Sequence, residues 1–175
     1  MFTDLVFEEG LTKVDAELDV IFVPTDDLVV EAMLKMAAVT QDDILYDLGC
    51  GDGRIVVAAA MEREAQAVGV DMDPRRIAEA NALAETVGVT DRVRFIQEDL
   101  LTVDFSGATV LTLYLLPSLN LKLKARILSE LKPGTRVIGH AFNMGRWQPD
   151  AKRAMGACIF TNGWFLRQCM VLGNG

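Results

Sequence analysis

Asp47-Leu48-Gly49-Cys50-Gly51-Asp52-Gly53-Arg54 is the stretch of sequence that decides the fold. It begins inside a short apolar run at residues 44–48 and leads into an alanine-rich segment, residues 54–63, with the composition of a helix. Three alternate glycines let the backbone turn sharply and approach a ligand closely, and the start of the following helix suits an anionic group such as a carboxylate. The pattern predicts a strand, a ligand-binding turn and a helix, as in open α/β sheets.

The same alternation of strands and helices continues outward along the chain. Pro74 suits the first turn of a helix and Gly88 its end, and Thr25 is the expected N-cap of the first helix. The expected elements are helices at 25–39, 54–63, 74–87 and 118–131, and strands at 44–48, 67–70, 93–96, 109–115 and 135–140. The alternation predicts a Rossmann-like, mostly parallel sheet with helices on both faces.

Beyond residue 142 no long amphipathic helix can be drawn. Two strand-like runs, residues 157–160 and 164–172, flank Thr161-Asn162-Gly163, and Asn-Gly between such runs is a strong hairpin signal. We therefore expect a C-terminal antiparallel hairpin that completes a seven-stranded sheet. The length of 175 residues fits one domain. Its expected parts are an acidic N-terminal segment at 1–24, a core at 25–142 and the hairpin at 143–175.

The formal net charge of −8 is distributed unevenly. Residues 1–31 hold nine acidic groups and one lysine, whereas residues 122–175 hold nine basic and two acidic groups. Overall acidity disfavours a dedicated nucleic-acid binder, and the longest apolar run, residues 55–61, is far below the roughly 18 residues of a membrane span. The start of the chain lacks the pattern of a secretory signal, so we expect a cytoplasmic protein. The cysteines lack metal-ligand spacing, and no metal site is expected.

Acidic residues stand at the ends of three successive predicted strands. Asp47 suits a ligand with an ammonium group, and Asp71, about 20 residues after the glycines, suits two ribose hydroxyls. Asp99 suits an adenine amino group, with Leu100 against the ring. Arg54 stands where a dinucleotide fingerprint needs glycine, so the dehydrogenase pattern fails. An amino acid, a ribose and an adenine together make S-adenosylmethionine, although each acid alone is also compatible with a purely structural role.

Four further motifs lie between about residues 19 and 150. They are Phe22-Val23-Pro24-Thr25, residues 46–55 around the glycines, Thr112-Leu113-Tyr114-Leu115-Leu116-Pro117 with Asn120, and Gly139-His140-Ala141-Phe142-Asn143-Met144-Gly145 with Trp147 and Pro149-Asp150. With them the sequence resembles the class I (seven-stranded) methyltransferases. More narrowly, it resembles the small protein lysine methyltransferase family, which includes archaeal broad-specificity enzymes and the mitochondrial enzymes acting on the adenine nucleotide translocase and the ATP synthase c subunit.

The resemblance implies a role for each candidate site residue. Thr25 would lie near the amino-acid end of the cofactor and Tyr114 would line the methyl-transfer channel. The expected cofactor-binding residues are Thr25, Asp47, Gly49, Cys50, Gly51, Gly53, Asp71, Met72, Asp99 and Leu100. The expected catalytic residues are Tyr114, which would orient the amine, Thr25, and His140 as proton acceptor. A packing role for Tyr114 and a structural role for His140 stay open.

The function expected from the sequence is that of an S-adenosylmethionine-dependent protein lysine N-methyltransferase, whose partner is a protein bearing a lysine. A methyltransferase acting on RNA or a small metabolite is the alternative, supported by the basic residues at 122–175. A protein that binds S-adenosylmethionine without catalysis is a third interpretation. The sequence does not determine the oligomeric state.

Overall fold

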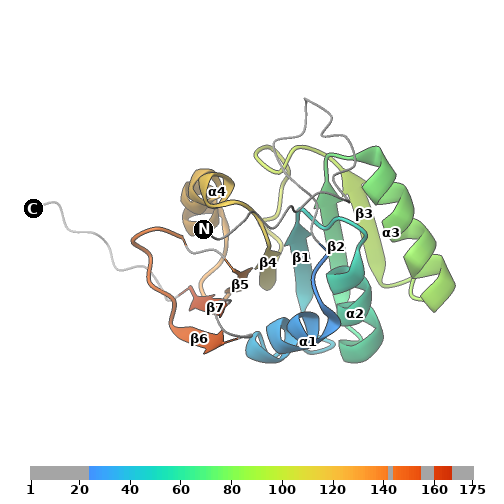
Figure 1. Cartoon of the computed structure of the whole chain (residues 1–175), viewed down its shortest axis with the longest axis horizontal. Coiled ribbons are helices and arrows are strands. Elements are labelled where there is room, and N and C mark those ends of the chain that lie inside the picture. Colours follow the sequence, from blue (N-terminus) through green and yellow to red (C-terminus); the bar gives the residue numbers. More distant parts are fainter. Residues whose placement is uncertain (1–23, 142–143, 155–159, 167–175) are drawn as a thin grey trace, which may run out of the picture.

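The computed structural model describes residues 24–141, 144–154 and 160–166, with the backbone alone for 160–162 and 165. Strands and helices alternate along most of this part of the chain (Figure 1). The helices are α1 (Asp27–Met36), α2 (Arg54–Arg63), α3 (Pro74–Val87) and α4 (Pro117–Glu130). The strands are β1 (Ile44–Leu48), β2 (Gln66–Asp71), β3 (Val93–Gln97), β4 (Val110–Leu113), β5 (Arg136–His140), β6 (Ala151–Ala154) and β7 (Phe160–Phe165). None of the helices in these ranges has the length and apolar character needed to span a membrane.

The seven strands form one sheet in the order β3-β2-β1-β4-β5-β7-β6. Strands β1 to β5 are parallel, whereas β7 pairs antiparallel with both β5 and β6. The predicted fold class, a mostly parallel sheet with a C-terminal antiparallel hairpin, is confirmed. The chain adds β2 and β3 on one side of β1, and then β4 and β5 on the other side. Ligands of such sheets bind where the order switches sides, here at the carboxyl ends of β1 and β4.

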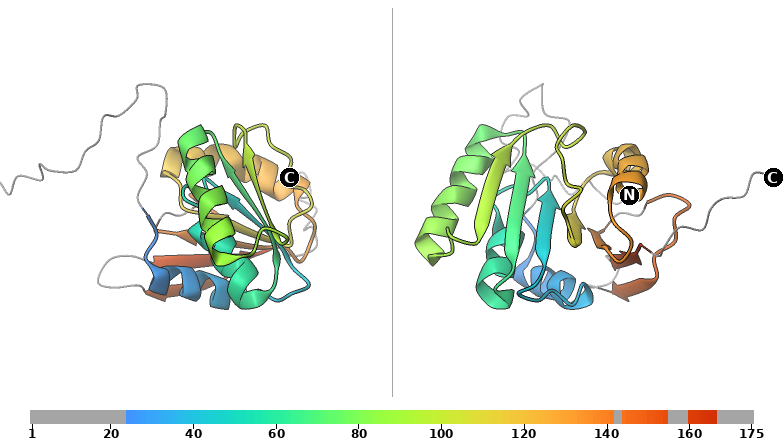
Figure 2. Two further views of the ribbon diagram at one scale, coloured as in Figure 1. Left: turned by 90° about the vertical axis from the view of Figure 1, so that its right-hand side faces the viewer. Right: turned by 180° about the vertical axis from the view of Figure 1, so that it is seen from behind.

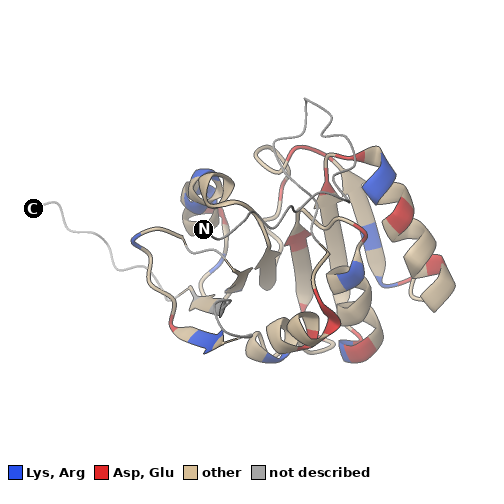
Figure 3. Ribbon diagram, viewed as in Figure 1, with Lys and Arg blue, Asp and Glu red and all other residues tan. Residues whose placement is uncertain are grey.

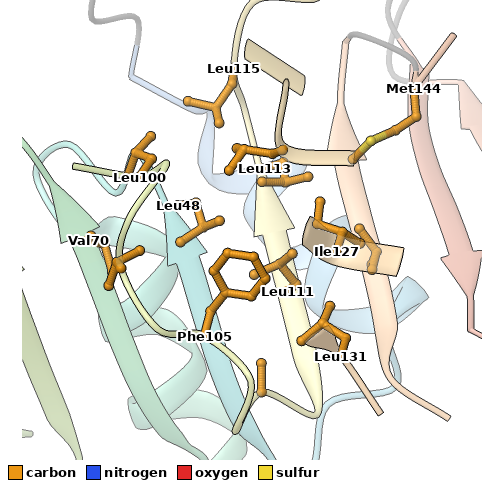
Figure 4. Packing of buried hydrophobic residues seen from close by; sticks show 14 of the residues in the cluster. Leu48, Val70, Leu100, Phe105, Leu111, Leu113, Leu115, Ile127, Leu131 and Met144 are labelled. Atoms are coloured by element: carbon orange, nitrogen blue, oxygen red, sulfur yellow. The ribbon is translucent and has the colours of Figure 1, made fainter. Parts of the chain in front are cut away.

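Helices cover both faces of the sheet, with α1, α2 and α3 on one face and α4 on the other (Figures 1 and 2). Side chains of each strand point alternately to the two faces of the sheet, so each strand contributes to a hydrophobic core on either face. In β1, Leu45 faces α1 and α2, whereas Leu48 faces the α4 side. On the α4 side, Phe105 is fully buried among leucines of β4 and the inner face of α4 (Figure 4). The apolar spacing of each strand therefore sets which helix it packs against.

The start of α1 differs from the prediction. Asp26, and not Thr25, caps the helix, because its carboxylate accepts the N–H of Leu28 at 2.9 Å. Thr25 is buried just before the cap. The side chain of Leu28 is 76% exposed, because the buried face of α1 runs through Val30, Met33 and Leu34.

The hairpin is present, but its turn was predicted at the wrong place. Asn162 and Gly163 lie inside β7, where Asn162 pairs with Gly139 and Gly163 with Ile138. A Cβ on Gly163 would lie 3.2 Å from the sulfur of Met36, so glycine here permits close packing of α1 on β7 and does not form a turn. Parts of the two expected strands, residues 157–159 and 167–172, lie outside the described residues.

Trp164 of β7 anchors the segment that follows β5. Its indole N–H donates to the Trp147 carbonyl at 3.0 Å, and the two rings lie 5.6 Å apart. Trp147 therefore packs against the hairpin.

An ion pair with a buried carboxylate ties together the amino ends of β1, β4 and β5. Asp43 is 6% exposed and pairs with Arg136, which also donates to the Ala37 carbonyl. Burial opposes ionisation of Asp43, but hydrogen bonds from Thr109 and Thr40 and the charge of Arg136 outweigh it and hold its pKa below the ordinary value. The carboxylate is therefore ionised and holds three strand ends and the end of α1 in register.

We predict that Asp43→Asn lowers the free energy of unfolding by about 3 kcal/mol, because it leaves the partly buried Arg136 guanidinium without its counter-charge. Urea unfolding of the two proteins measures the difference. Glu79→Gln, in the half-exposed pair that Glu79 forms with Arg76 on α3, is the control and should cost less than about 1 kcal/mol. Equal effects of the two substitutions would contradict the assignment of Asp43 as the tie between the strands.

Candidate functional site

Residues 49–53, here named the glycine loop, turn sharply between β1 and α2. Gly49, Gly51 and Gly53 have φ values of +81°, +53° and +80°, a region that favours glycine. The N–H groups of Gly49 and Cys50 both donate to the Val70 carbonyl, at 2.8 and 3.0 Å. A Cβ on Gly49 would lie 2.6 Å from a methyl group of Leu115. The loop thus needs its glycines both for conformation and for space.

Asp71 stands at the tip of β2 against the glycine loop. Its two carboxylate oxygens accept the backbone N–H groups of Gly51 and Asp73, each at 2.9 Å. A carboxylate oxygen has more than one acceptor position, so Asp71 keeps capacity for further donors while its orientation is fixed. Figure 3 shows acidic residues at the carboxyl ends of β1 and β2 and along the loop after β3.

Asp47 is buried beneath the loop, with 2% of its surface exposed. The Thr112 hydroxyl donates to its carboxylate at 2.7 Å. Burial above all, with the nearby charges of Asp71 and Asp52, raises the pKa of Asp47 to about 7 against the lowering effect of this hydrogen bond. A buried carboxyl group with a raised pKa beside two more acids is a site that a cationic ligand would stabilise, as expected for an ammonium-bearing amino acid.

The third predicted acid, Asp99, follows β3, and its carboxylate accepts the N–H of Leu101 at 2.8 Å. The adjacent Leu100 is buried close to Gly49, because a Cβ on that glycine would lie 3.8 Å from the leucine methyl. Arg126 of α4 holds this segment by donating to the Leu100 and Val103 carbonyls at 3.3 and 2.8 Å. The loop after β3 therefore closes against the glycine loop.

Two other predicted cofactor-binding residues differ in their surroundings. Cys50 is 6% exposed, its sulfur faces Gly69, and burial first of all raises the pKa of its thiol, so the thiol is not a nucleophile. Met72 is 47% exposed at the end of β2. Among the described residues, no group of three or more metal-ligating side chains is assembled.

A cleft of about 710 Å³ lies beside α1, and we name it the α1 cleft. Its wall comes from the segment before α1, one side of α1, the carboxyl ends of β4 and β5, and β6. The lining residues are Pro24, Thr25, Asp26, Leu28, Val29, Glu31, Ala32, Lys35, Tyr114, His140, Arg153 and Ala154. All three residues expected to be catalytic, Thr25, Tyr114 and His140, are therefore brought together in it.

Tyr114 and His140 form an edge-to-face aromatic pair in the cleft. Their ring centroids lie 4.7 Å apart with an interplanar angle of 68°. His140 is 4% exposed, and burial lowers the pKa of its imidazole below the ordinary value, so the ring is neutral at pH 7. The pair presents an aromatic and uncharged wall to the cleft.

Three residues at the site were missed as functional candidates: Thr112, Asp52 and Arg54. Thr112 lies beside Asp47 because the two are paired residues of β4 and β1. The only trace of this in the sequence is a threonine between the apolar residues Val110-Leu111 and Leu113. Asp52 and Arg54 pair side chain to side chain, and Arg54 also donates to the Thr25 carbonyl at 2.8 Å. Strand register and contacts across 29 residues are not visible in the sequence.

Comparison with known families decides the class of the protein. The profile of the ANTKMT methyltransferase domain matches residues 47–151, which include the glycine loop, Asp71, Tyr114 and His140. The chain belongs to this family. The methyltransferase resemblance found in the sequence is confirmed, and the protein is a methyltransferase.

Relatives agree with this assignment. The chain is 49% identical over 129 residues to a protein-lysine N-methyltransferase of Saccharolobus islandicus, covering 73% of this chain and 80% of that one. It is 35% identical to the Xenopus laevis enzyme named as the lysine N-methyltransferase of the ATP synthase c subunit, and that match spans 74% of this chain but 56% of the other protein. The chain thus spans little more than half of the vertebrate relative.

A solved structure of 45% identity has the same fold. It is described as an RNA methyltransferase from Salinibacter ruber in complex with S-adenosyl-L-homocysteine, with a TM-score of 0.83 over 86% of this chain and 97% of that one. S-adenosyl-L-homocysteine is what remains of S-adenosylmethionine after its methyl group has been transferred. With the fit of Asp47 to a cationic ligand, the match confirms the predicted cofactor, S-adenosylmethionine.

We predict that S-adenosylmethionine binds more tightly as the pH rises through about 7. Below that pH the Asp47 carboxyl is protonated and must lose its proton to face a cation, at a cost of up to tenfold in affinity per pH unit. Titration calorimetry between pH 5.5 and 8.5 measures this profile. Asp47→Asn should bind weakly with a flat profile, and Thr112→Val should move the midpoint to higher pH because it removes the hydrogen bond that lowers the pKa. A flat profile in the unchanged protein would contradict the prediction.

Proposed function

We propose that this protein is an S-adenosylmethionine-dependent protein lysine N-methyltransferase whose acceptor lysine enters the α1 cleft. The observation that carries the proposal is the position of Tyr114 and His140 in one cleft, whose lining residue Thr25 is joined through Arg54 to the glycine loop above the buried Asp47. The lysine acceptor is favoured by the names of the archaeal and vertebrate relatives. A cytoplasmic location remains a prediction.

We assign the cofactor contacts as the sequence predicted them. Asp47 would face the ammonium of the methionine moiety, the glycine loop its carboxylate, Asp71 the ribose hydroxyls, and Asp99 the adenine. The fixed orientation of Asp71 and the raised pKa of Asp47 support these roles. When bound, the cofactor supplies a methyl group on a positively charged sulfur, which needs no acid catalysis of the leaving group.

The chain's own residues must then orient an amine and remove its proton. A lysine with its ordinary pKa of about 10.4 arrives as an ammonium and has no lone pair for attack. Asp26 and Glu31 on the cleft wall would attract the charged side chain, and the aromatic surface of Tyr114 would hold it in line for transfer. Neutral His140 has an imidazole nitrogen that can take up the proton.

Methylation of RNA is the second candidate, because the Salinibacter relative is described as an RNA methyltransferase. The basic residues at 122–175 gave this alternative its support in the sequence, but several of them serve the fold. Arg126 pairs with Glu130 and holds the loop after β3, and Arg136 pairs with Asp43. These guanidinium groups are committed to internal contacts, which weakens the case for a nucleic-acid surface.

Labelling distinguishes the two acceptors. The purified protein is incubated with methyl-labelled S-adenosylmethionine and a cell extract, and the labelled fraction is identified. Discrete protein bands that resist nuclease and disappear when lysines are chemically capped are the expected result. Label removed by nuclease would overturn the lysine assignment and support RNA, and label confined to small molecules would support a metabolite. Asp47→Asn, which should bind the cofactor only weakly, is the negative control.

A charge reversal sharpens the choice between acceptors. Lys122 is exposed on α4, so Lys122→Glu should leave methyl transfer to protein unchanged. If RNA binds this surface, the same substitution should weaken RNA binding and make it less dependent on salt. Arg126→Glu is unsuitable for this test because it would release the loop after β3. The measurement is acceptor labelling at about 50 and about 200 mM salt.

We predict that Tyr114→Phe or Tyr114→Ala lowers kcat about tenfold to a hundredfold, with the larger loss for alanine, because the amine is held less well in line. The affinity for S-adenosylmethionine should change little. Tyr46→Phe is the matched control, since this second tyrosine packs against the core on the α4 side. An unchanged kcat for Tyr114→Ala would show that the ring only packs.

A further inference from the structure

Arg54, the first residue of α2, joins two parts of the site that are far apart in sequence. Its Nε and Nη2 donate to the two carboxylate oxygens of Asp52 at 3.0 and 2.6 Å. Its Nη1 donates to the carbonyl oxygen of Thr25 at 2.8 Å. One guanidinium therefore bridges the glycine loop and the segment that lines the α1 cleft before α1 begins.

The geometry of this bridge is fixed from the loop side. Asp52 lies between Gly51 and Gly53, both with positive φ, so its position follows the conformation of the loop. Burial opposes ionisation of Asp52, but the hydrogen bond and charge of Arg54 outweigh it and hold its pKa below the ordinary value. Because the guanidinium is planar, a two-pronged contact with Asp52 leaves the direction of Nη1 determined.

On the cleft side, the bridge reaches the start of α1. Asp26 follows Thr25 directly and caps the helix, and the N–H groups of Val29 and Val30 donate to its carbonyl at 2.9 and 3.0 Å. Asp26 and Asp27 also add their negative charge to the surroundings of Arg54. A shift of the Thr25 carbonyl would therefore shift the cap and, with it, one wall of the cleft.

We propose that Arg54 is a positioning residue: by holding the Thr25 carbonyl, it fixes the start of α1, and with it one wall of the acceptor side, relative to the glycine loop that would hold the cofactor. Arg54 touches neither reacting group and acts through the Thr25 carbonyl. The statement about the acceptor rests on the function proposed above, whereas the bridge between loop and α1 does not.

Lysine at position 54 separates the two contacts. It keeps the positive charge next to Asp52, but a single ammonium group on a flexible stem does not reproduce the planar fork. Arg54→Lys should therefore keep the loop paired and release the Thr25 carbonyl, while Arg54→Met should lose both contacts. Arg63→Met is the matched control, since Arg63 is the last residue of α2 and pairs with Glu31 of α1.

Hydrogen exchange of the Leu28, Val29 and Val30 amides reports the wall directly, because all three donate to Asp26. At saturating S-adenosyl-L-homocysteine, we expect Arg54→Lys to speed their exchange about tenfold, the effect of losing one charge-assisted hydrogen bond. Arg54→Met should show at least the same increase, and Arg63→Met should stay within about twofold of the unchanged protein. Affinity for S-adenosyl-L-homocysteine in Arg54→Lys should change less than about threefold.

Exchange of these amides at the unchanged rate in Arg54→Lys would overturn the proposal. Loss of S-adenosyl-L-homocysteine binding in Arg54→Lys would also overturn it, since Arg54 would then serve the loop alone. With the acceptor protein found by labelling, the proposal further requires a higher KM for the acceptor and an unchanged KM for S-adenosylmethionine. The exchange measurement needs no acceptor, so its failure is distinct from a failure of the lysine assignment.

Discussion

The hydrogen bonds from Gly49 and Cys50 to the Val70 carbonyl fix the glycine loop on the end of β2, and the whole site is arranged around this attachment. Because the donors are backbone groups, the loop must follow a path that only glycines allow. Gly51 then comes within reach of the Asp71 carboxylate, and Asp47 is enclosed beneath the turn. Asp47, Asp52 and Asp71 are thus brought near one another, and the pKa of the buried Asp47 is raised. A cationic cofactor would stabilise the ionised form of Asp47.

Three arginines of this fold each hold a connecting segment in place by the same kind of contact. Arg54, Arg126 and Arg136 each pair with one carboxylate and donate to one or more backbone carbonyls of a segment distant in sequence. The carboxylate orients the guanidinium, and the remaining N–H groups satisfy carbonyls outside the sheet and helices. Two of these arginines support the glycine loop and the loop after β3, so site geometry and loop stability depend on the same side chains.

Most of the parallel core was predictable because its elements have strong local signals. Residues 44–48, 54–63 and 74–87 form the expected strand and helices with the expected ends, since Gly53, Pro74 and Gly88 impose local backbone conformations. The C-terminal hairpin was placed wrongly because Asn-Gly also suits a strand that packs closely against a helix. The Asn-Gly pair looks the same in a hairpin turn and in such a strand. The packing of Met36 of α1 against Gly163, which favours the strand, is a contact that the local sequence does not show.

The sequence by itself determined the alternation of strands and helices, the methyltransferase family and the order of acids at the strand ends, because spacing and residue type are local properties. Only the tertiary structure decided which groups meet: Thr112 beside Asp47 through strand register, Tyr114 against His140 in one cleft, and Arg54 on the Thr25 carbonyl. Such contacts join residues up to 65 positions apart. Their distances depend on how the strands pair and how the helices pack, and no local pattern encodes either.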